Sequence, residues 1–437
     1  GFDGVTPELI MSDRSGTLLP RLAAMNMEDL GTLQREVVRA IRAVGCSAHL
    51  TFNVPFHLTE HKLLGLNSTE YLRLSREFSP GSIFHETSDR YCLSFSKWLL
   101  AARTLNLPYG DEGNQPPPTY EHNVLSYQWM AMMQCYDALY CQWFGGRPAA
   151  QNIAWLKPYY KLLFNAEYLP DPVALAVSLD TGFAETPEVF RRGLHQTTSA
   201  HYSLANLLRV LNINADRYLV DRFPELDRNV TARLLIDDVT REVGSAFGDR
   251  LEAFMRNGGT FLATLDTDSL NRYAFFRRFG VDIGDGGRIS GRGVTIRKGV
   301  RDIAVKQVGK GRLLILSGSW ATGNWDPGEP EAYLEFVRGL ILREGAFRQI
   351  VRTDVTDVFA TPFRAPEGDI LIQLFNITAE PRRVTLTVDR SAAGPDDVMF
   401  DHGRGTLLPA DYSDDGLYAV AEVPPLGSTL IRVGKKR

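Results

Sequence analysis

The chain has 437 residues, of which 44% are hydrophobic and 23% are charged, and this composition is typical of globular proteins. A chain of this length is expected to form two to four domains, and the sequence pattern predicts three. A formal net charge of -4 without a long basic run argues against binding to nucleic acid or to an anionic membrane, and fits a neutral substrate. No apolar run approaches the roughly 18 residues that a membrane span needs.

The first 168 residues alternate short apolar runs with amphipathic helical patterns, as βα units do. A whole (β/α)8 barrel needs about 250 residues, so we expect the C-terminal half of such a barrel here, with the remaining strands upstream or on another chain. The expected strands are 1–5, 47–54, 107–112 and 139–144, and the expected helices are 29–45, 89–106 and 122–138.

Residues 169–347 are expected to form a doubly wound parallel sheet of the flavodoxin or amidotransferase type, because their strand-like runs are almost continuously hydrophobic. The expected strands are 173–179, 217–221, 232–238, 260–265 and 312–318, and the expected helices are 203–212, 247–259 and 329–345. Amidotransferase-like chemistry uses a cysteine nucleophile, and no cysteine follows Cys141. We therefore expect an interaction role for this domain.

Residues 348–437 change character again and are expected to form a small antiparallel β-sandwich. Short β-rich segments are separated by glycine, proline and aspartate turns, with no helical pattern between them. The expected strands are 369–378, 382–389, 417–423 and 428–434.

The segment LPYGDEGNQPPP (107–118) is the most informative for chemistry. A short apolar strand carries Asp111 and Glu112 at its carboxyl end, which is the catalytic face of a barrel, and Gly113 then permits a sharp turn. Glycosidic cleavage uses a pair of carboxylates. We predict that Glu112 is one of them.

The second carboxylate has three candidates. Glu8 follows the expected opening strand, about one hundred residues before Glu112, which suits strands four and seven. Glu86 precedes an expected helix, where it could instead serve as a capping acid. A residue outside this chain is the third.

Polar and aromatic residues near the same strand ends are candidates for sugar binding. Trp143 could stack on the apolar face of a pyranose. The polar candidates, which could bond sugar hydroxyls, are His85, Asp89, Arg90, Asp111, Asn114 and Gln115.

No metal and no cofactor are predicted. The four cysteines have neither metal-ligand nor disulfide-scaffold spacing, so buried reduced thiols are expected, and the eight histidines form no ligand motif. The first residues lack the basic and apolar regions of a signal peptide, so we expect a cytoplasmic protein.

The order of these parts resembles family 42 β-galactosidases and related clan A glycoside hydrolases. VALAVSLD, LLRVLNINADRYLVD, ARLLIDD and DRLEAFMRNGGTFLATLD look like that family's trimerisation domain, and LIQLFNITAEPRRVTL looks like its C-terminal domain. The resemblance implies that Glu112, in GDEG, is the nucleophile ending barrel strand seven. The family's acid/base follows an asparagine after strand four, whereas Pro7 precedes Glu8 here.

The leading hypothesis is therefore a retaining, exo-acting, β-galactosidase-like glycosidase, and the resemblance implies a homotrimer around the middle domain. The alternative is a non-catalytic or degenerate barrel subunit that binds glycan, or that scaffolds a complex with a chain supplying the rest of the barrel.

Overall fold

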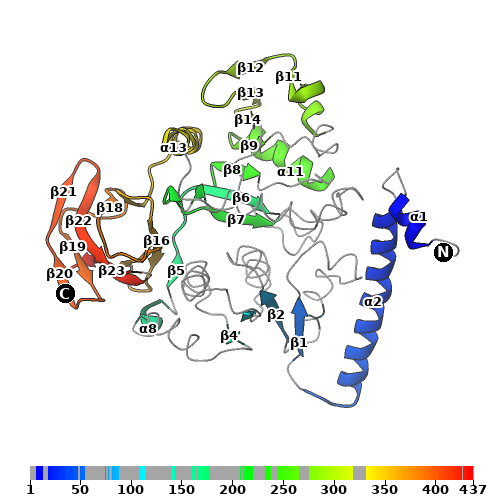
Figure 1. Ribbon diagram of the computed structural model, residues 1–437, viewed down its shortest axis with the longest axis horizontal. Coiled ribbons are helices and arrows are strands. Elements are labelled where there is room, and N and C mark those ends of the chain that lie inside the picture. Colours follow the sequence, from blue (N-terminus) through cyan, green and yellow to red (C-terminus); the bar gives the residue numbers. More distant parts are fainter. Residues whose placement is uncertain are drawn as a thin grey trace.

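The computed structural model places the helix α1 (Pro7–Ser12) and the C-terminal sandwich at opposite ends of the longest axis (Figure 1). It describes residues 6–12, 18–47, 50–54, 74, 77, 81–87, 109–113, 139–142, 159–163, 166–177, 207–208, 210–219, 232–237, 245–264, 275–317, 331–425 and 427–436.

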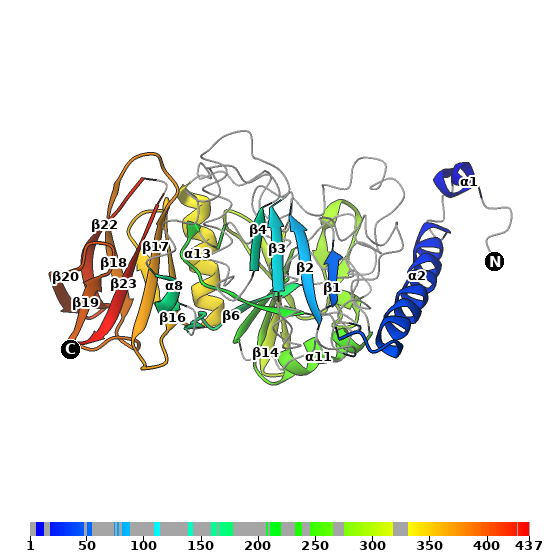
Figure 2. The same cartoon turned by 90° about the horizontal axis from the view of Figure 1, so that it is seen from below.

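The N-terminal part contains a four-stranded sheet in which all neighbouring strands are parallel and follow one another in chain order (Figure 2). Its strands are β1 (Leu50–Val54), β2 (Gly81–Thr87), β3 (Tyr109–Gly113) and β4 (Leu139–Gln142). Three of them match expected strands, whereas β2 was not predicted. The expected strand 1–5 and the expected helices 89–106 and 122–138 lie outside the described residues.

Helix α2 (Leu18–Ala43) begins eleven residues before the expected start at residue 29 and ends two residues before the expected end at residue 45. Gly45 has a φ of +76°, and the amide of Cys46 donates to the Ile41 carbonyl at 3.3 Å, so the chain leaves the helix through a left-handed glycine. Cys46 follows this cap and is exposed, so the prediction of a buried thiol is wrong for it.

The middle domain is a flavodoxin-like sheet, as the sequence predicts. Five parallel strands lie in the order β7-β6-β8-β9-β14, which in chain order among these five is 2-1-3-4-5. They are β6 (Val173–Val177), β7 (Asp216–Leu219), β8 (Leu234–Asp237), β9 (Thr260–Thr264) and β14 (Gly311–Leu316).

The sheet continues beyond β14 into two antiparallel strands that were not predicted, β13 (Ile303–Val308) and β12 (Val294–Arg297). Helix α11 (Ser245–Arg256) packs on this sheet through Leu251 and Met255. Within the described residues, the domain also contains β10 (Asp282–Ile283), η4 (Asp285–Gly287), β11 (Ile289–Ser290) and α13 (Glu331–Gly345).

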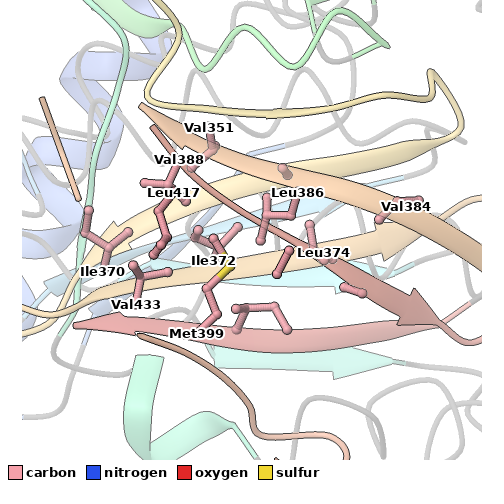
Figure 3. Packing of buried hydrophobic residues seen from close by; sticks show 14 of the residues in the cluster. Val351, Ile370, Ile372, Leu374, Val384, Leu386, Val388, Met399, Leu417 and Val433 are labelled. Atoms are coloured by element: carbon pink, nitrogen blue, oxygen red, sulfur yellow. The ribbon is translucent and has the colours of Figure 1, made fainter. Parts of the chain in front are cut away.

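The C-terminal part is a sandwich of two antiparallel sheets, as expected, with orders β15-β18-β22-β21 and β20-β19-β23-β17-β16-β5. The core between the sheets is aliphatic, with Ile372 and Val433 from one sheet meeting Leu386 from the other (Figure 3). The strands are β15 (Val351–Thr353), β16 (Val358–Arg364), β17 (Ile370–Asn376), β18 (Arg382–Asp389), β19 (Asp397–Asp401), β20 (Thr406–Leu408), β21 (Ala410–Ser413), β22 (Gly416–Val423) and β23 (Ser428–Lys435).

Residues that precede the middle domain complete this sandwich. Strand β5 (Glu167–Tyr168) pairs with the edge of β16, and helix α8 (Tyr160–Leu163) packs near it on the outer face of the six-stranded sheet. Because this outer face is also covered, every residue of β17 is buried. The sandwich therefore draws on both sides of the middle domain in the sequence.

A buried polar network joins the middle domain to the sandwich. The Asp171 carboxylate accepts the backbone N–H groups of Asn214 (2.8 Å) and Ile350 (2.9 Å). The Asn212 side chain donates to Thr353 Oγ1 at 2.7 Å and accepts the amide of Ala360 at 2.7 Å. These bonds fix the segment before β7 against the first strands of the sandwich.

The network predicts a pH-dependent stability. Burial raises the pKa of Asp171 to about 7, outweighing the two N–H bonds that favour the carboxylate. As the pH rises from about 4 to about 7, the unfolded chain loses this proton while the folded chain keeps it, so stability falls. Relative to Asp171→Asn, we expect the wild-type free energy of unfolding in urea to fall by up to about 1.4 kcal/mol per pH unit. Parallel pH profiles for the two proteins would contradict this assignment.

Candidate active site

The carboxyl ends of β2 and β3 bring two of the predicted acids together. Glu112 is the register partner of Glu86 in the parallel ladder between these strands. Neighbouring strands lie about 4.8 Å apart, and partners in a parallel ladder lie on the same face of the sheet. The chain therefore has two carboxylate-bearing positions side by side at one end of one sheet.

The alternation of the strand separates Asp111 from Glu112. Successive strand positions fall on opposite faces, so Asp111 shares the other face with its register partner His85. The row that contains Glu86 and Glu112 continues to Cys141 on β4. Glu112 therefore lies on the same face of the sheet as Glu86, and Asp111 lies on the opposite face.

Glu8 lies in the first turn of α1 and is exposed. Its pKa is lowered because the carboxylate accepts a hydrogen bond from its own backbone and one from Thr6, which also accepts the amide of Leu9 at 3.2 Å. A lowered pKa is expected of an acid at a helix N-terminus. A general acid needs a raised pKa, so the shift argues against that role for Glu8. In both views α1 lies beyond α2, apart from β1–β4, so the structure does not bring Glu8 to Glu112 (Figures 1 and 2).

The other predicted sugar-binding residues fall outside the described residues. These are Asp89, Arg90, Asn114, Gln115 and Trp143. Gly113 is the last residue of β3, so the turn expected after it lies in the same undescribed stretch. Their roles remain predictions.

Sequence reasoning missed the Glu86–Glu112 pairing because it missed β2. The prediction for this stretch considers only that Glu86 precedes an expected helix. The apolar pair Ile83 and Phe84, which follows a Pro-Gly turn signal at 80–81, is typical of a short buried strand. Once 81–87 is recognised as a strand, Glu86 lies near its carboxyl end, as Glu112 does on β3.

The described residues meet the requirements of neither a metal site nor a membrane span. Within the described residues, no group of three or more His, Cys, Asp or Glu side chains is placed to hold a metal ion. None of the described helices is long and apolar enough to cross a membrane.

Asp237 and Thr264 are buried at the carboxyl ends of β8 and β9, where open α/β sheets usually bind ligands.

No protein-family model and no curated protein matches this sequence. Solved structures do match the fold. A β-galactosidase from the haloarchaeon Halorubrum lacusprofundi is 12% identical with a TM-score of 0.60, over 99% of this chain and 70% of that one. The β-galactosidase of Bacillus circulans sp. alkalophilus is 16% identical with a TM-score of 0.54, over 88% of this chain and 63% of that one.

A family 42 β-galactosidase from G. stearothermophilus is 13% identical with a TM-score of 0.53, over 86% of this chain and 67% of that one. The expected resemblance to this family is therefore confirmed at the level of the fold. The chain spans 67% and 70% of the length of the G. stearothermophilus and Halorubrum lacusprofundi proteins, and 63% of the Bacillus circulans enzyme, which is less than two thirds.

Proposed function

We propose that this chain is the carbohydrate-cleaving part of a retaining, exo-acting glycoside hydrolase in which Glu112 is the nucleophile. The observation that carries the proposal is the position of Glu112 at the carboxyl end of a parallel strand, beside Glu86 on the next strand. Because β1–β4 are parallel and follow chain order, they have the arrangement of four consecutive strands of a (β/α)8 barrel. Catalytic residues of such barrels lie at these strand ends.

In the proposed reaction, the Glu112 carboxylate attacks the anomeric carbon while a second carboxylic acid protonates the departing oxygen. Water then cleaves the glycosyl ester, with the second residue acting as base. Two inversions at the anomeric carbon give net retention. Retaining enzymes hold the two carboxyl groups about 5–5.5 Å apart, which neighbouring positions on adjacent strands can satisfy.

Among the candidates for the acid/base, Glu86 is supported by its register with Glu112. Glu8 is opposed by its exposure and its lowered pKa. A residue outside this chain is the alternative, because the family resemblance places the acid/base on an earlier strand. The homotrimer that the resemblance implies stays a prediction.

Glu86→Ala tests the assignment of the acid/base. If Glu86 protonates the leaving group, kcat falls by about 10²–10⁴-fold for a poor leaving group such as an alkyl glycoside. The loss is much smaller for a 2,4-dinitrophenyl glycoside, which departs without protonation. Steady-state kinetics on both substrates provide the measurement, and proton NMR of the first-formed sugar checks retention.

The matched control is Glu77→Ala, which removes an exposed acid nearby in the sequence. Equal losses on the two substrates would remove Glu86 from the acid/base role. A first-formed product of inverted configuration would overturn the retaining mechanism.

A further inference from the structure

A cavity of about 550 Å³ lies in the middle domain between helix α13 and the strands β12–β14. This size is typical of small-ligand pockets. Its lining has five basic residues and two acidic ones. The basic residues are Arg297, Lys298, Arg301, Arg312 and Arg343, and the acidic ones are Glu335 and Glu344.

Three of the arginines converge on one carboxylate. Glu344, in the last turn of α13, has a side chain that is only 1% exposed. It is paired with the guanidinium groups of Arg297 (2.8 Å), Arg312 (3.0 Å) and Arg343 (3.1 Å). One negative charge thus positions three positive ones, and their side chains remain 33–61% exposed.

The remaining pairs do not remove this imbalance. Glu335 is paired at 2.6 Å with Arg338, and Lys298 at 2.5 Å with Asp302. Arg338 and Asp302 both lie outside the cavity lining, and their opposite charges cancel. The lining therefore keeps an excess of three positive charges. Arg301 lies with its guanidinium carbon 4.8 Å from the centre of the Tyr333 ring.

A glycine keeps the cavity open from the helix side. Gly339 lines the cavity from the middle of α13, where glycine is less favourable than alanine. Apart from the neighbouring residues and backbone of its own helix, a Cβ atom built on it would meet no atom within 4 Å, so packing against the rest of the chain does not require a glycine there. The space that a side chain would occupy is left to the cavity.

We propose that this cavity is a binding site for a small ligand carrying phosphate or sulfate ester groups. A guanidinium presents a planar fork of N–H donors that matches the oxygens of such groups, and three of them are already positioned by Glu344. Ile303 and Phe336 add an apolar wall for the carbon skeleton of the ligand. None of its lining residues lies on β1–β4, the strands that carry Glu86 and Glu112.

The test is isothermal titration calorimetry of the full chain at fixed ionic strength, with inorganic pyrophosphate in one arm and a disulfated disaccharide in the other. We expect saturable binding in at least one arm, and the arm that binds more tightly shows whether the site prefers phosphate groups or sulfate esters. Lys298→Gln combined with Arg343→Gln should weaken binding at least about tenfold, because two charge-assisted contacts are lost. The control, Lys310→Gln combined with Arg390→Gln, removes the same charge from exposed positions outside the lining and should bind as the wild type.

Gly339→Leu separates loss of the site from loss of the fold. It places a side chain in the open space of a helical position, so the melting temperature should be maintained or raised while binding is lost. The proposal is overturned if neither ligand binds saturably, if the control variant weakens binding as much as the cavity variant, or if Gly339→Leu binds as the wild type.

Discussion

Glu112→Gln is expected to lower kcat by at least about 10³-fold on the aryl glycoside that the wild-type protein hydrolyses fastest. The amide has the size of the carboxylate but cannot form the glycosyl ester, so the first step of a retaining mechanism stops. Steady-state kinetics measure the loss. The far-ultraviolet circular dichroism spectrum should stay unchanged, because the substitution keeps the side-chain volume.

Two further variants make this result specific. Glu367→Gln makes the same chemical change at an exposed turn of the sandwich and should leave kcat unchanged. Asp111→Asn changes the neighbouring acid on the opposite face of β3 and should cost far less than Glu112→Gln. If Asp111→Asn abolishes turnover while Glu112→Gln does not, the register argument has selected the wrong acid.

Asn212→Ala is expected to lower the free energy of unfolding of the middle domain and sandwich by about 3 kcal/mol. Asn212 is buried, and the substitution leaves the amide of Ala360 and the hydroxyl of Thr353 without their Asn212 partner. Its φ of +53° is also a left-handed conformation that alanine adopts less readily than asparagine. Urea unfolding followed by intrinsic fluorescence measures the loss.

A series at this position separates the two causes. Asn212→Gly relieves the backbone strain but restores none of the hydrogen bonds, so it should be less destabilising than Asn212→Ala by about 1 kcal/mol. Asn257→Ala, at an exposed position after α11, should change the stability by less than about 0.5 kcal/mol. A loss at residue 212 no larger than at residue 257 would show that the network contributes little.

Elements that were predicted correctly are those whose own sequence pattern matches their burial. Strands β8 and β9 are buried at every position, and their sequences, LLID and TFLAT, are mostly apolar. Strand β16 was missed, although six of its seven residues are buried, because Pro362 interrupts it. Proline is tolerated there because it lies where the ladder with β5 ends: β5 pairs with Phe363 and Arg364, and the Leu169 amide donates to the Pro362 carbonyl at 3.0 Å, a bond that needs no N–H from the proline. Strand β12 was missed because it has four residues, three of them exposed, so its alternation of apolar and polar residues is too short to predict a strand.

The candidate site divides in the same way. Glu112 could be predicted because the pattern that marks it, a short strand ending in Gly113, lies in one continuous stretch of sequence. Its pairing with Glu86 depends on register, which in parallel strands is set by the intervening chain and its packing and not by the strand residues themselves. The basic residues around Glu344 come from separate elements, α13 and the strands β12 and β14, so no single stretch of sequence reveals their convergence.

The pairing of β5 with β16 makes the middle domain an insertion into the sandwich, tethered at one end to the six-stranded sheet through β5 and at the other to the four-stranded sheet through β15. A fragment that starts at residue 348 would lack β5 and α8, exposing the edge of β16 together with the apolar surface around Phe363 and Leu371. Exposed strand edges of this kind promote self-association. The sandwich is therefore a poor autonomous module, and a protease cut within the inserted sheet would leave two pieces still held together by main-chain hydrogen bonds.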